Sequence, residues 1–409
     1  MREGWEIKKL GEVCEVITKG TTPTSLGFKF TDLGVNFIKV ESLTESGKII
    51  PNKVAYISEE CHQSLKRSQL KENDILFSIA GALGRIGIVN KEIVPANTNQ
   101  ALAIVRLAKN SGISVSFLAK YFTSNIISEE IEKLKGGAAQ QNLSLGQLNN
   151  LSIPFPSFPE QQRIVAILDE AFAAIAKAKA NAELNLKNAK ELFESYLQGV
   201  FESKGEDWEE KTLGDVLVKT ETIDPTKKPN KEFIYLDVSS VNKETKEIEN
   251  ATVLLGKDAP SRARKLVRTN DVIFATVRPT HSRVALITEE YDEQVCSTGY
   301  IILRAKEFLN NNLVYYFLLT YSFNKQMDKL QKGASYPAVT DSEVKGIYIY
   351  FPKSLKKQDA IVQKLEALSA ETKKLEAIYQ QKINDLEELK KSVLQKAFSG
   401  ELKTDKLCV

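Results

Sequence analysis

Cysteine and histidine are scarce in this chain of 409 residues, which holds four of the first and two of the second. No pair of cysteines has C-x-x-C spacing; they stand at Cys14, Cys61, Cys296 and Cys408. A structural zinc site needs four suitably spaced Cys or His ligands, so none is expected, and free thiols in a reducing cytoplasm are the predicted state. The chain also lacks any apolar run of about 18 residues and any apolar N-terminal segment, so neither a membrane span nor secretion is expected.

An excess of charge of one sign is lacking as well, since the formal net charge is only +3. Residues 1–156 hold 18 basic and 15 acidic side chains, and residues 204–352 hold 21 and 22. A DNA-binding face would therefore depend on where the charges lie and not on their sum.

Catalytic motifs are missing too. In Gly47-Lys48-Ile49 an isoleucine stands where a phosphate-binding loop requires Ser or Thr. The glycines from Gly81 to Gly87 do not have the spacing of a dinucleotide-binding turn and favour a tight turn instead. The sequence has no Asp/Asn-Pro-Pro-aromatic motif of the kind that amino-methyltransferases carry, and no clear pairing of nucleophile and base. We expect no catalytic activity, cofactor or metal in the chain itself.

What the chain does contain is a long internal repeat, with matching segments about 200 residues apart. The clearest matches are Trp5 to Val13 with Trp208 to Val216, Asn73 to Phe77 with Asn270 to Phe274, Gln161 with Gln358, and Glu194 to Phe201 with Lys391 to Phe398. Solenoid repeats are only about 20–50 residues long. The sequence therefore indicates two copies of a whole module.

Each module begins with a globular domain, predicted for residues 1–156 and 204–352, of α/β (mixed α+β) character. Short β-type runs such as Asp74 to Ile79 and Val272 to Val277 are separated by Gly- and Asn-rich turns. Helical stretches near Val115–Leu134 and Leu313–Leu330 follow.

Each globular domain is followed by a long helix, predicted for residues 157–203 and, together with a C-terminal tail, for residues 353–409. Apolar residues recur there in alternating steps of three and four, the period of a coiled-coil seam. The first seam is Val165, Leu168, Phe172, Ile175, Lys179, Ala182, Leu186, Ala189, Phe193, Tyr196 and Val200, and the second is Leu365, Leu368, Thr372, Leu375, Tyr379, Lys382, Leu386, Leu389 and Val393. A helix of roughly 40–45 residues spans roughly 60–68 Å, too long to lie inside one domain of this size.

The two helices are expected to pack against each other as an antiparallel coiled coil, because this buries both seams within one chain. That pairing predicts a pseudo-two-fold internal repeat, with a globular domain near each end of the pair. Pairing of each helix with another subunit is the alternative.

The module ends carry a family resemblance. Pro156 to Asp169 matches the pattern P-x-x-x-E-Q-x-x-I-x-x-x-L-D, and Trp-Glu-x-x-x-Leu-Gly-Glu/Asp-Val occurs at Trp5 and again at Trp208. These segments, together with Ser392 to Leu402, resemble the first spacer helix, the domain starts and the C-terminal ending of DNA-specificity subunits of type I restriction-modification systems. The second helix departs from this pattern, since Lys356-Lys357-Gln358-Asp359 stands where Glu-Gln-Gln-Arg is expected.

The resemblance implies that each globular part is a target-recognition domain that reads one half of a bipartite, asymmetric double-stranded DNA target. The helices would set the spacer and dock two methyltransferase subunits, which would bind S-adenosylmethionine. Separate motor-nuclease subunits would hydrolyse ATP and cleave DNA. The chain would be the non-catalytic specificity subunit.

Candidate DNA-binding residues are polar, basic or aromatic side chains in loops between the predicted strands, where they can read base edges or contact phosphates. In the first domain they are Lys19, Thr21, Thr22, Arg85, Asn97, Asn99, Gln100, Gln140 and Gln141. In the second they are Lys219, Thr222, Arg278, His281, Arg283, Ser335 and Tyr336. Any one of them could instead be a solvated turn residue. Arg85 and Arg283 form the best pair, because both follow the repeated Asn-Asp strand at similar distance, and loss of Arg283 is expected to affect one half-site only.

Three other interpretations stay open. The chain could be the specificity subunit of a related bipartite-target system that cuts on both sides of its target. It could be a coiled-coil adaptor without a DNA role, which would leave the polar loops unexplained. A self-sufficient methyltransferase or nuclease is disfavoured by the missing motifs.

Overall fold

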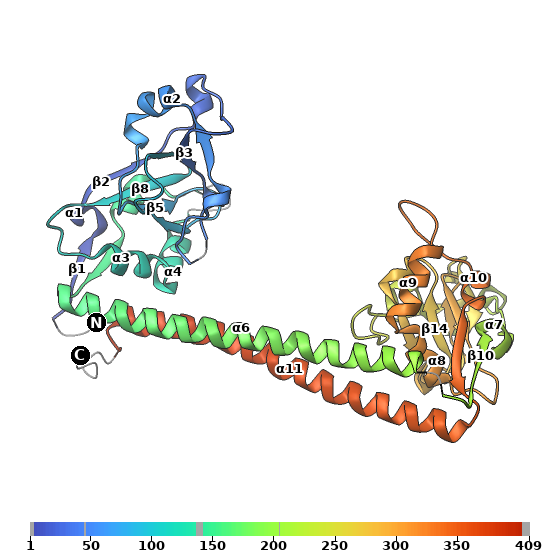
Figure 1. The fold of residues 1–409 in the computed structure, drawn as a ribbon. Helices are drawn as coiled ribbons and strands as arrows, with labels where there is room; N and C mark the ends of the chain where they lie inside the picture. The colour runs from blue at the N-terminus through green and yellow to red at the C-terminus, as the bar shows by residue number, and fades with distance from the viewer. Residues whose placement is uncertain (1–3, 45, 136–141, 204, 403–409) are drawn as a thin grey trace. The chain divides into compact units, whose positions relative to one another are not determined.

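The computed structural model describes residues 4–44, 46–135, 142–203 and 205–402, whose helices and strands are drawn in Figure 1. The chain divides into two units, one formed by residues 1–182 and 381–409 and the other by residues 183–380. Each unit therefore combines one globular domain with parts of both long helices.

The globular domain of the first unit is built on two sheets and one strand pair. Its strands are β1 (Glu6–Lys9), β2 (Cys14–Lys19), β3 (Val35–Ile38), β4 (Ala55–Ile57), β5 (Ile75–Ser78), β6 (Ile86–Ile88), β7 (Ala96–Thr98), β8 (Leu102–Leu107) and β9 (Ser152–Phe155). Its helices are α1 (Leu10–Val13), α2 (Glu59–Ser64), α3 (Val115–Phe122), α4 (Asn125–Leu134) and α5 (Leu145–Asn149). The larger sheet has the antiparallel order β2-β8-β5-β6, the smaller sheet the order β4-β3-β7, and β1 pairs with β9.

The globular domain of the second unit repeats this plan. Its strands are β10 (Trp208–Thr212), β11 (Glu232–Leu236), β12 (Thr252–Leu255), β13 (Ala263–Leu266), β14 (Val272–Ala275), β15 (Val284–Leu286), β16 (Val295–Ser297), β17 (Tyr300–Leu303) and β18 (Tyr348–Pro352). Its helices are α7 (Leu213–Val216), α8 (Asn311–Leu318), α9 (Tyr321–Leu330) and α10 (Asp341–Lys345). The sheets have the orders β15-β14-β17 and β12-β11-β16-β13, and β10 pairs with β18. The predicted mixed α/β fold is confirmed.

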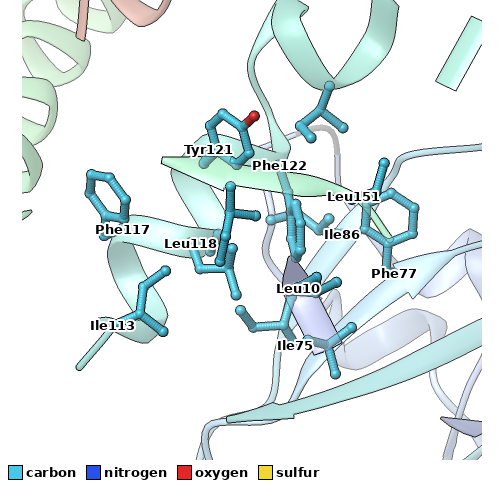
Figure 2. Close-up of a cluster of buried hydrophobic side chains, with 14 of the residues drawn as sticks. Leu10, Ile75, Phe77, Ile86, Ile113, Phe117, Leu118, Tyr121, Phe122 and Leu151 are labelled. Carbon is cyan, nitrogen blue, oxygen red and sulfur yellow. The ribbon is translucent and has the colours of Figure 1, made fainter. Parts of the chain in front are cut away.

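β5, one of the two inner strands of the larger sheet, is buried on both faces, which explains its unbroken apolar run. Phe77 of β5 meets Phe122 of α3 edge to face, with 5.1 Å between the ring centroids. Figure 2 shows Leu10 and Leu151 in the same cluster of buried side chains, which belongs to the face covered by α3. Leu76 belongs to a different cluster, together with side chains of β8 and of the smaller sheet.

The repeated Asn-Asp pair before this strand has one structural role in both units. Asn73 and Asn270 adopt left-handed backbone conformations, with φ of 70° and 68°, which asparagine tolerates better than most residues. The following aspartate accepts two hydrogen bonds from an arginine that lies in β8 in the first unit and directly after β17 in the second. The two pairs are Asp74 with Arg106 and Asp271 with Arg304.

The long helices are α6 (Phe158–Glu202) and α11 (Leu355–Ser399), and they run antiparallel to each other. In the first unit Leu168 near the start of α6 shares a buried cluster with Leu394 and Phe398 near the end of α11. In the second unit Phe201 at the end of α6 shares a cluster with Leu365 near the start of α11. The predicted intrachain pairing is therefore confirmed.

The second predicted seam is partly wrong. Leu375 and Leu389 are 38% and 48% exposed, although Thr372 is only 2% exposed. A straight α-helix has 3.6 residues per turn, so positions chosen at a strict 3.5 period drift off the contact face over several turns. The first seam holds better: Lys179, its one polar member, forms an ion pair with Glu387 of α11. Near its end, however, Leu197 is buried while Tyr196 is 39% exposed.

A buried glutamine joins each long helix to the globular domain before it. The Gln161 amide donates to the carbonyl oxygens of Gly112 and Pro156 and accepts from the Ser114 N–H. Gln358 makes the same three bonds in the second unit, with Phe308, Pro352 and Asn310. This role explains why the glutamine recurs even though its neighbours in the second copy differ from the family pattern.

Replacing Gln161 by leucine is expected to destabilise the first unit. The substitution leaves one N–H and two carbonyl groups without their partner, at a cost of about 2–3 kcal/mol. Calorimetric unfolding of the full chain should show a midpoint lower by several degrees for the affected unit. Gln162→Leu is the matched control, because Gln162 is exposed. Equal midpoints for the two variants would contradict this role of Gln161.

Candidate nucleic-acid interface

One end of the larger sheet in the first unit gathers most of the candidate residues. The antiparallel registers pair Lys19 with Ala103, Ser78 with Leu102, and Phe77 with Ile86. The last residues of β2 and β5 therefore lie beside the first residues of β8 and β6. The loops that follow or precede these strands, residues 20–22, 79–85 and 99–101, leave the sheet at this same end.

Hydrogen bonds tie these loops together. The Thr21 N–H donates to the Thr98 carbonyl over 3.1 Å, and the Thr22 hydroxyl bonds with the Gln100 side chain. A Cβ on Gly20 would come within 2.0 Å of the Thr98 carbonyl oxygen, so this close approach of two backbones requires glycine. Thr21, Thr22, Asn99 and Gln100 thus form one polar surface, with Lys19 exposed beside it.

Arg67 adds a basic group that the sequence pattern does not reveal. Its guanidinium lies 3.4 Å from the Thr21 hydroxyl oxygen and reaches this surface from the segment after α2. No strand-end spacing marks this arginine, so only the folded chain brings it to the other candidates.

The prediction that Asn97 contacts DNA is wrong. Its side chain is fully buried; its carbonyl oxygen accepts from His62, and its amide donates to Leu65 and Ser68. A buried amide with these partners is structural and has no polar atom to offer a base. Gln140 and Gln141 lie outside the described residues.

Arg85 and Arg283 occupy matching places, but neither guanidinium is presented freely to solvent. Arg85 donates to the Leu43 carbonyl over 3.5 Å, and Arg283 donates to the Val241 carbonyl. Both residues are partly buried. Each arginine thus braces a loop against its domain, so the expected effect of losing Arg283 acts through the loop's position.

A compact group of candidates lies at the corresponding sheet end of the second unit. The Arg278 N–H donates to the Pro337 carbonyl over 2.7 Å, and the Arg278 guanidinium lies 5.0 Å from the Tyr336 ring centre. The Tyr336 side chain is 72% exposed, and Ser335 beside it is exposed as well. An exposed guanidinium over an aromatic face suits both base stacking and phosphate contact.

The electrostatics of this group extend to residues on neighbouring segments. Desolvation and the charges of Arg278, Lys243 and Arg283 lower the pKa of His281. Lys243 comes from the turn between Val241 and Ile248, which sequence reasoning does not connect with this loop. Positive charge is therefore concentrated locally in a domain whose overall charge is close to zero.

Lys219 and Thr222 lie apart from this group. Thr222 pairs with Lys265 of β13. Lys219 is exposed and follows Val218, whose N–H donates to the Arg304 carbonyl at the opposite end of the sheet. Lys219 and Thr222 therefore do not occupy the places that Lys19 and Thr22 occupy in the first domain. The reason is that the segment after α7 runs differently from β2, which follows α1 in the first domain.

The comparison with known protein families settles the relationship. The family model described as type I restriction modification DNA specificity domain matches residues 2–186 and again residues 205–388. The chain belongs to this family. The resemblance read from the module ends is confirmed, and each family match covers one of the two repeated modules.

Relatives with assigned functions are specificity subunits. The type I restriction enzyme EcoBI specificity subunit of Escherichia coli is 34% identical over 159 residues, a match that covers 38% of this chain and 33% of that protein. The putative MjaX specificity subunit of Methanocaldococcus jannaschii is 23% identical over a match that covers 98% of this chain and 94% of that protein.

Solved structures share the fold over nearly the full length. A chain from a study of complex assembly and conformational transition of the type I R-M system gives a TM-score of 0.79 at 18% identity, covering 98% of this chain and 99% of that one. The HsdS subunit from Thermoanaerobacter tengcongensis gives 0.65 at 18% identity, with 98% of both chains covered.

Other features of the described residues concern membranes and metals. Within the ranges that the structure describes, no helix is both long and apolar enough to cross a bilayer. The same ranges hold no group of three or more His, Cys, Asp or Glu side chains arranged for a metal ion. Cys14, Cys61 and Cys296 are free thiols, and Cys408 lies outside the described residues.

Proposed function

We propose that this chain is the non-catalytic subunit that gives a type I restriction-modification complex its DNA sequence specificity. Each globular domain reads one half of a bipartite, asymmetric double-stranded target through the loops at one end of one sheet, the sheet that contains β5 in the first unit and β14 in the second. Family membership supports the role in specificity. The placement of the loops supports the division of labour between the domains.

The observation that carries the proposal is that the two globular domains share the same supporting contacts but present different loops. Both units keep the buried Asp–Arg pair and the glutamine that joins helix to domain. The loop after the central strand differs: it turns at Gly81 and Gly84 in the first unit, and at Arg278 and Ser282 in the second. One frame that presents two different sets of side chains suits the reading of two different half-sites.

The long helices are the proposed docking sites for two methyltransferase subunits. Within the second unit, Leu184 and Leu192 of α6 and Ile378 of α11 are half or more exposed, although they are large apolar residues. A docked subunit would cover these exposed apolar side chains. The docked subunits would bind S-adenosylmethionine, the motor-nuclease subunits would bind ATP, and the chain itself would need no cofactor.

Two alternatives use the same fold. The specificity subunit of a related system that cuts on both sides of its target would differ in its partners and not in its way of reading DNA. A coiled-coil adaptor without a DNA role is disfavoured by the basic group around Arg278, which has no function in an adaptor.

Genome-wide methylation mapping in a methylation-free host tests the proposal. The host carries the cognate methyltransferase with and without this chain. Methyl-adenine at one split, asymmetric motif, present only when the chain is present, is the expected result. An unchanged methylation pattern with the cognate partner expressed would contradict it and favour the adaptor.

The helices should also set the distance between the two half-sites. A helix grows by about 6 Å when four residues are added, and one base pair spans about 3.4 Å. Four residues inserted near Ala180, matched by four in α11 near Gln381, should lengthen the recognised spacer by one or two base pairs. Both half-sites should stay the same in the methylation map. A spacer of unchanged length would rule out the ruler role.

His281 should make DNA binding depend on pH. Its pKa is lowered in the free protein by desolvation and by neighbouring positive charges, and a DNA phosphate nearby would raise it again. Binding would then take up a proton, so affinity should rise as pH falls from 8 to 6. In titrations with target DNA, the gain in affinity between pH 8 and pH 6 should be about two- to fivefold larger for the native complex than for His281→Gln. Equal pH profiles would place His281 away from the phosphates.

A further inference from the structure

The loop from Arg278 to Ser282 has a backbone that needs support. Arg278 and Ser282 have φ of 50° and 46°, in the left-handed region that residues with a Cβ adopt at a cost. The first unit has glycine at both corresponding turns, Gly81 and Gly84. Contacts from elsewhere in the second unit must therefore keep this loop in place.

Two side chains from different elements hold the loop. The Lys246 ammonium, from the turn between Val241 and Ile248, donates to the Ser282 carbonyl over 2.8 Å and also to the Lys243 carbonyl. The Asn324 amide, from α9, donates to the Thr280 carbonyl over 3.2 Å and to the Ser282 hydroxyl. Both side chains end on backbone or hydroxyl groups of the loop.

Core packing does not replace these bonds on that side of the loop. Ser282, Lys246 and Asn324 all line a cavity of about 1150 Å³ within the second unit. Desolvation and the charge of Arg283 lower the pKa of Lys246 to about 8, which fits an ammonium turned inward to the loop. On this side the loop is thus held by polar bonds whose donors line the cavity, while Pro279 is buried in the domain.

We infer that Lys246 and Asn324 are positioning residues. They hold the loop so that Arg278 and His281 face the second half-site, the half of the DNA target that the second globular domain reads. In this way they set selectivity at that half-site. The inference rests on the proposed function, because it assumes that this loop reads DNA. Lys246 and Asn324 would then determine specificity without contacting DNA, because they act through the loop that carries Arg278 and His281.

The test compares Lys246→Met with Lys246→Arg in the complex with the methyltransferase. Methionine fills a similar volume but cannot donate a hydrogen bond, whereas arginine can. Methylation of a target library with randomised half-sites should show about a tenfold loss of selectivity at the second half-site for Lys246→Met. Selectivity at the first half-site should stay unchanged, and Lys246→Arg should keep most of the native selectivity. Asn324→Leu, which acts from α9, should produce the same one-sided loss.

Salt dependence separates positioning from a direct phosphate contact. Loss of a phosphate contact weakens all sequences alike and reduces the slope of log affinity against log salt by about one. A reduced slope with native selectivity for Lys246→Met would overturn the inference, as would equal loss at both half-sites. Arg278→Ala in the same library distinguishes failure of the positioning role from failure of the proposed interface. If it relaxes selectivity while Lys246→Met does not, only the positioning role fails. If it changes neither affinity nor selectivity, the proposed placement of the interface fails.

Discussion

Asp271→Ala is expected to lower the free energy of unfolding of the second unit by about 3–5 kcal/mol. The carboxylate is 1% exposed and accepts from Arg304 Nε over 2.7 Å and from Arg304 Nη2 over 2.8 Å. It also accepts from the Arg268 N–H over 2.8 Å, which fixes the turn before β14. Removing it leaves a largely buried guanidinium with only the more exposed Glu221 carboxylate as a charged partner. Small domains are stable by only about 5–15 kcal/mol, so the loss is a large fraction of the total.

Calorimetric unfolding of the full chain measures this effect, and Glu221→Ala provides the matched control. Glu221 also accepts from Arg304, over 2.9 Å, but its side chain is 45% exposed, so its loss should cost less than about 1 kcal/mol. Asp74→Ala should destabilise the first unit in the same way, since Asp74 makes the equivalent bonds with Arg106. Similar unfolding midpoints for Asp271→Ala and Glu221→Ala would show that the buried pair does not hold the frame.

Arg278→Ala is expected to relax recognition of the second half-site by about tenfold or more. A well-placed bidentate contact from arginine to a base contributes about 1–3 kcal/mol of discrimination. Arg278 is suited to such a contact, because its guanidinium lies over the exposed Tyr336 ring and its backbone is fixed by Pro337. The measurement is methylation of a library in which each half-site is randomised in turn, with native selectivity expected at the first half-site.

Lys243→Ala is the matched control for Arg278, since it removes one nearby positive charge from an exposed turn. It should weaken binding to all sequences and reduce the salt slope by about one without changing selectivity. If Arg278→Ala behaves in the same way as Lys243→Ala, Arg278 contacts phosphate and another residue reads the base.

The frame of this protein could be predicted because it is encoded in local patterns. The apolar steps of α6 and α11 predict long paired helices. The recurrence of Asn73-Asp74 predicts a repeated domain, and the structure shows that it forms a turn and a buried ion pair in both copies. Gln161 and Gln358 recur for a similar reason, as each satisfies three backbone groups at a helix start. Patterns of this kind survive in sequence because burial fixes the residue type.

The proposed DNA-contacting surface could be predicted only in part, because tertiary contacts bring its residues together. Asn97 has the residue type of a base reader, yet the His62 ring and two other groups bind it in the core. Lys246 lies 36 residues before Ser282, whose carbonyl it holds by a hydrogen bond. No spacing rule connects the turn between Val241 and Ile248 to the loop that follows β14.

Hydrogen–deuterium exchange of the complex with its methyltransferase, with and without target DNA, tests the location of the interface most directly. The account predicts that DNA slows exchange in residues 19–22 and 276–283, at the proposed DNA-reading ends of the sheets that contain β5 and β14. Residues 71–75 and 268–272, beside the buried Asp–Arg pairs at the opposite ends, should exchange at the same rate in both states. Slower exchange at those opposite ends, with unchanged exchange in the two loops, would contradict it.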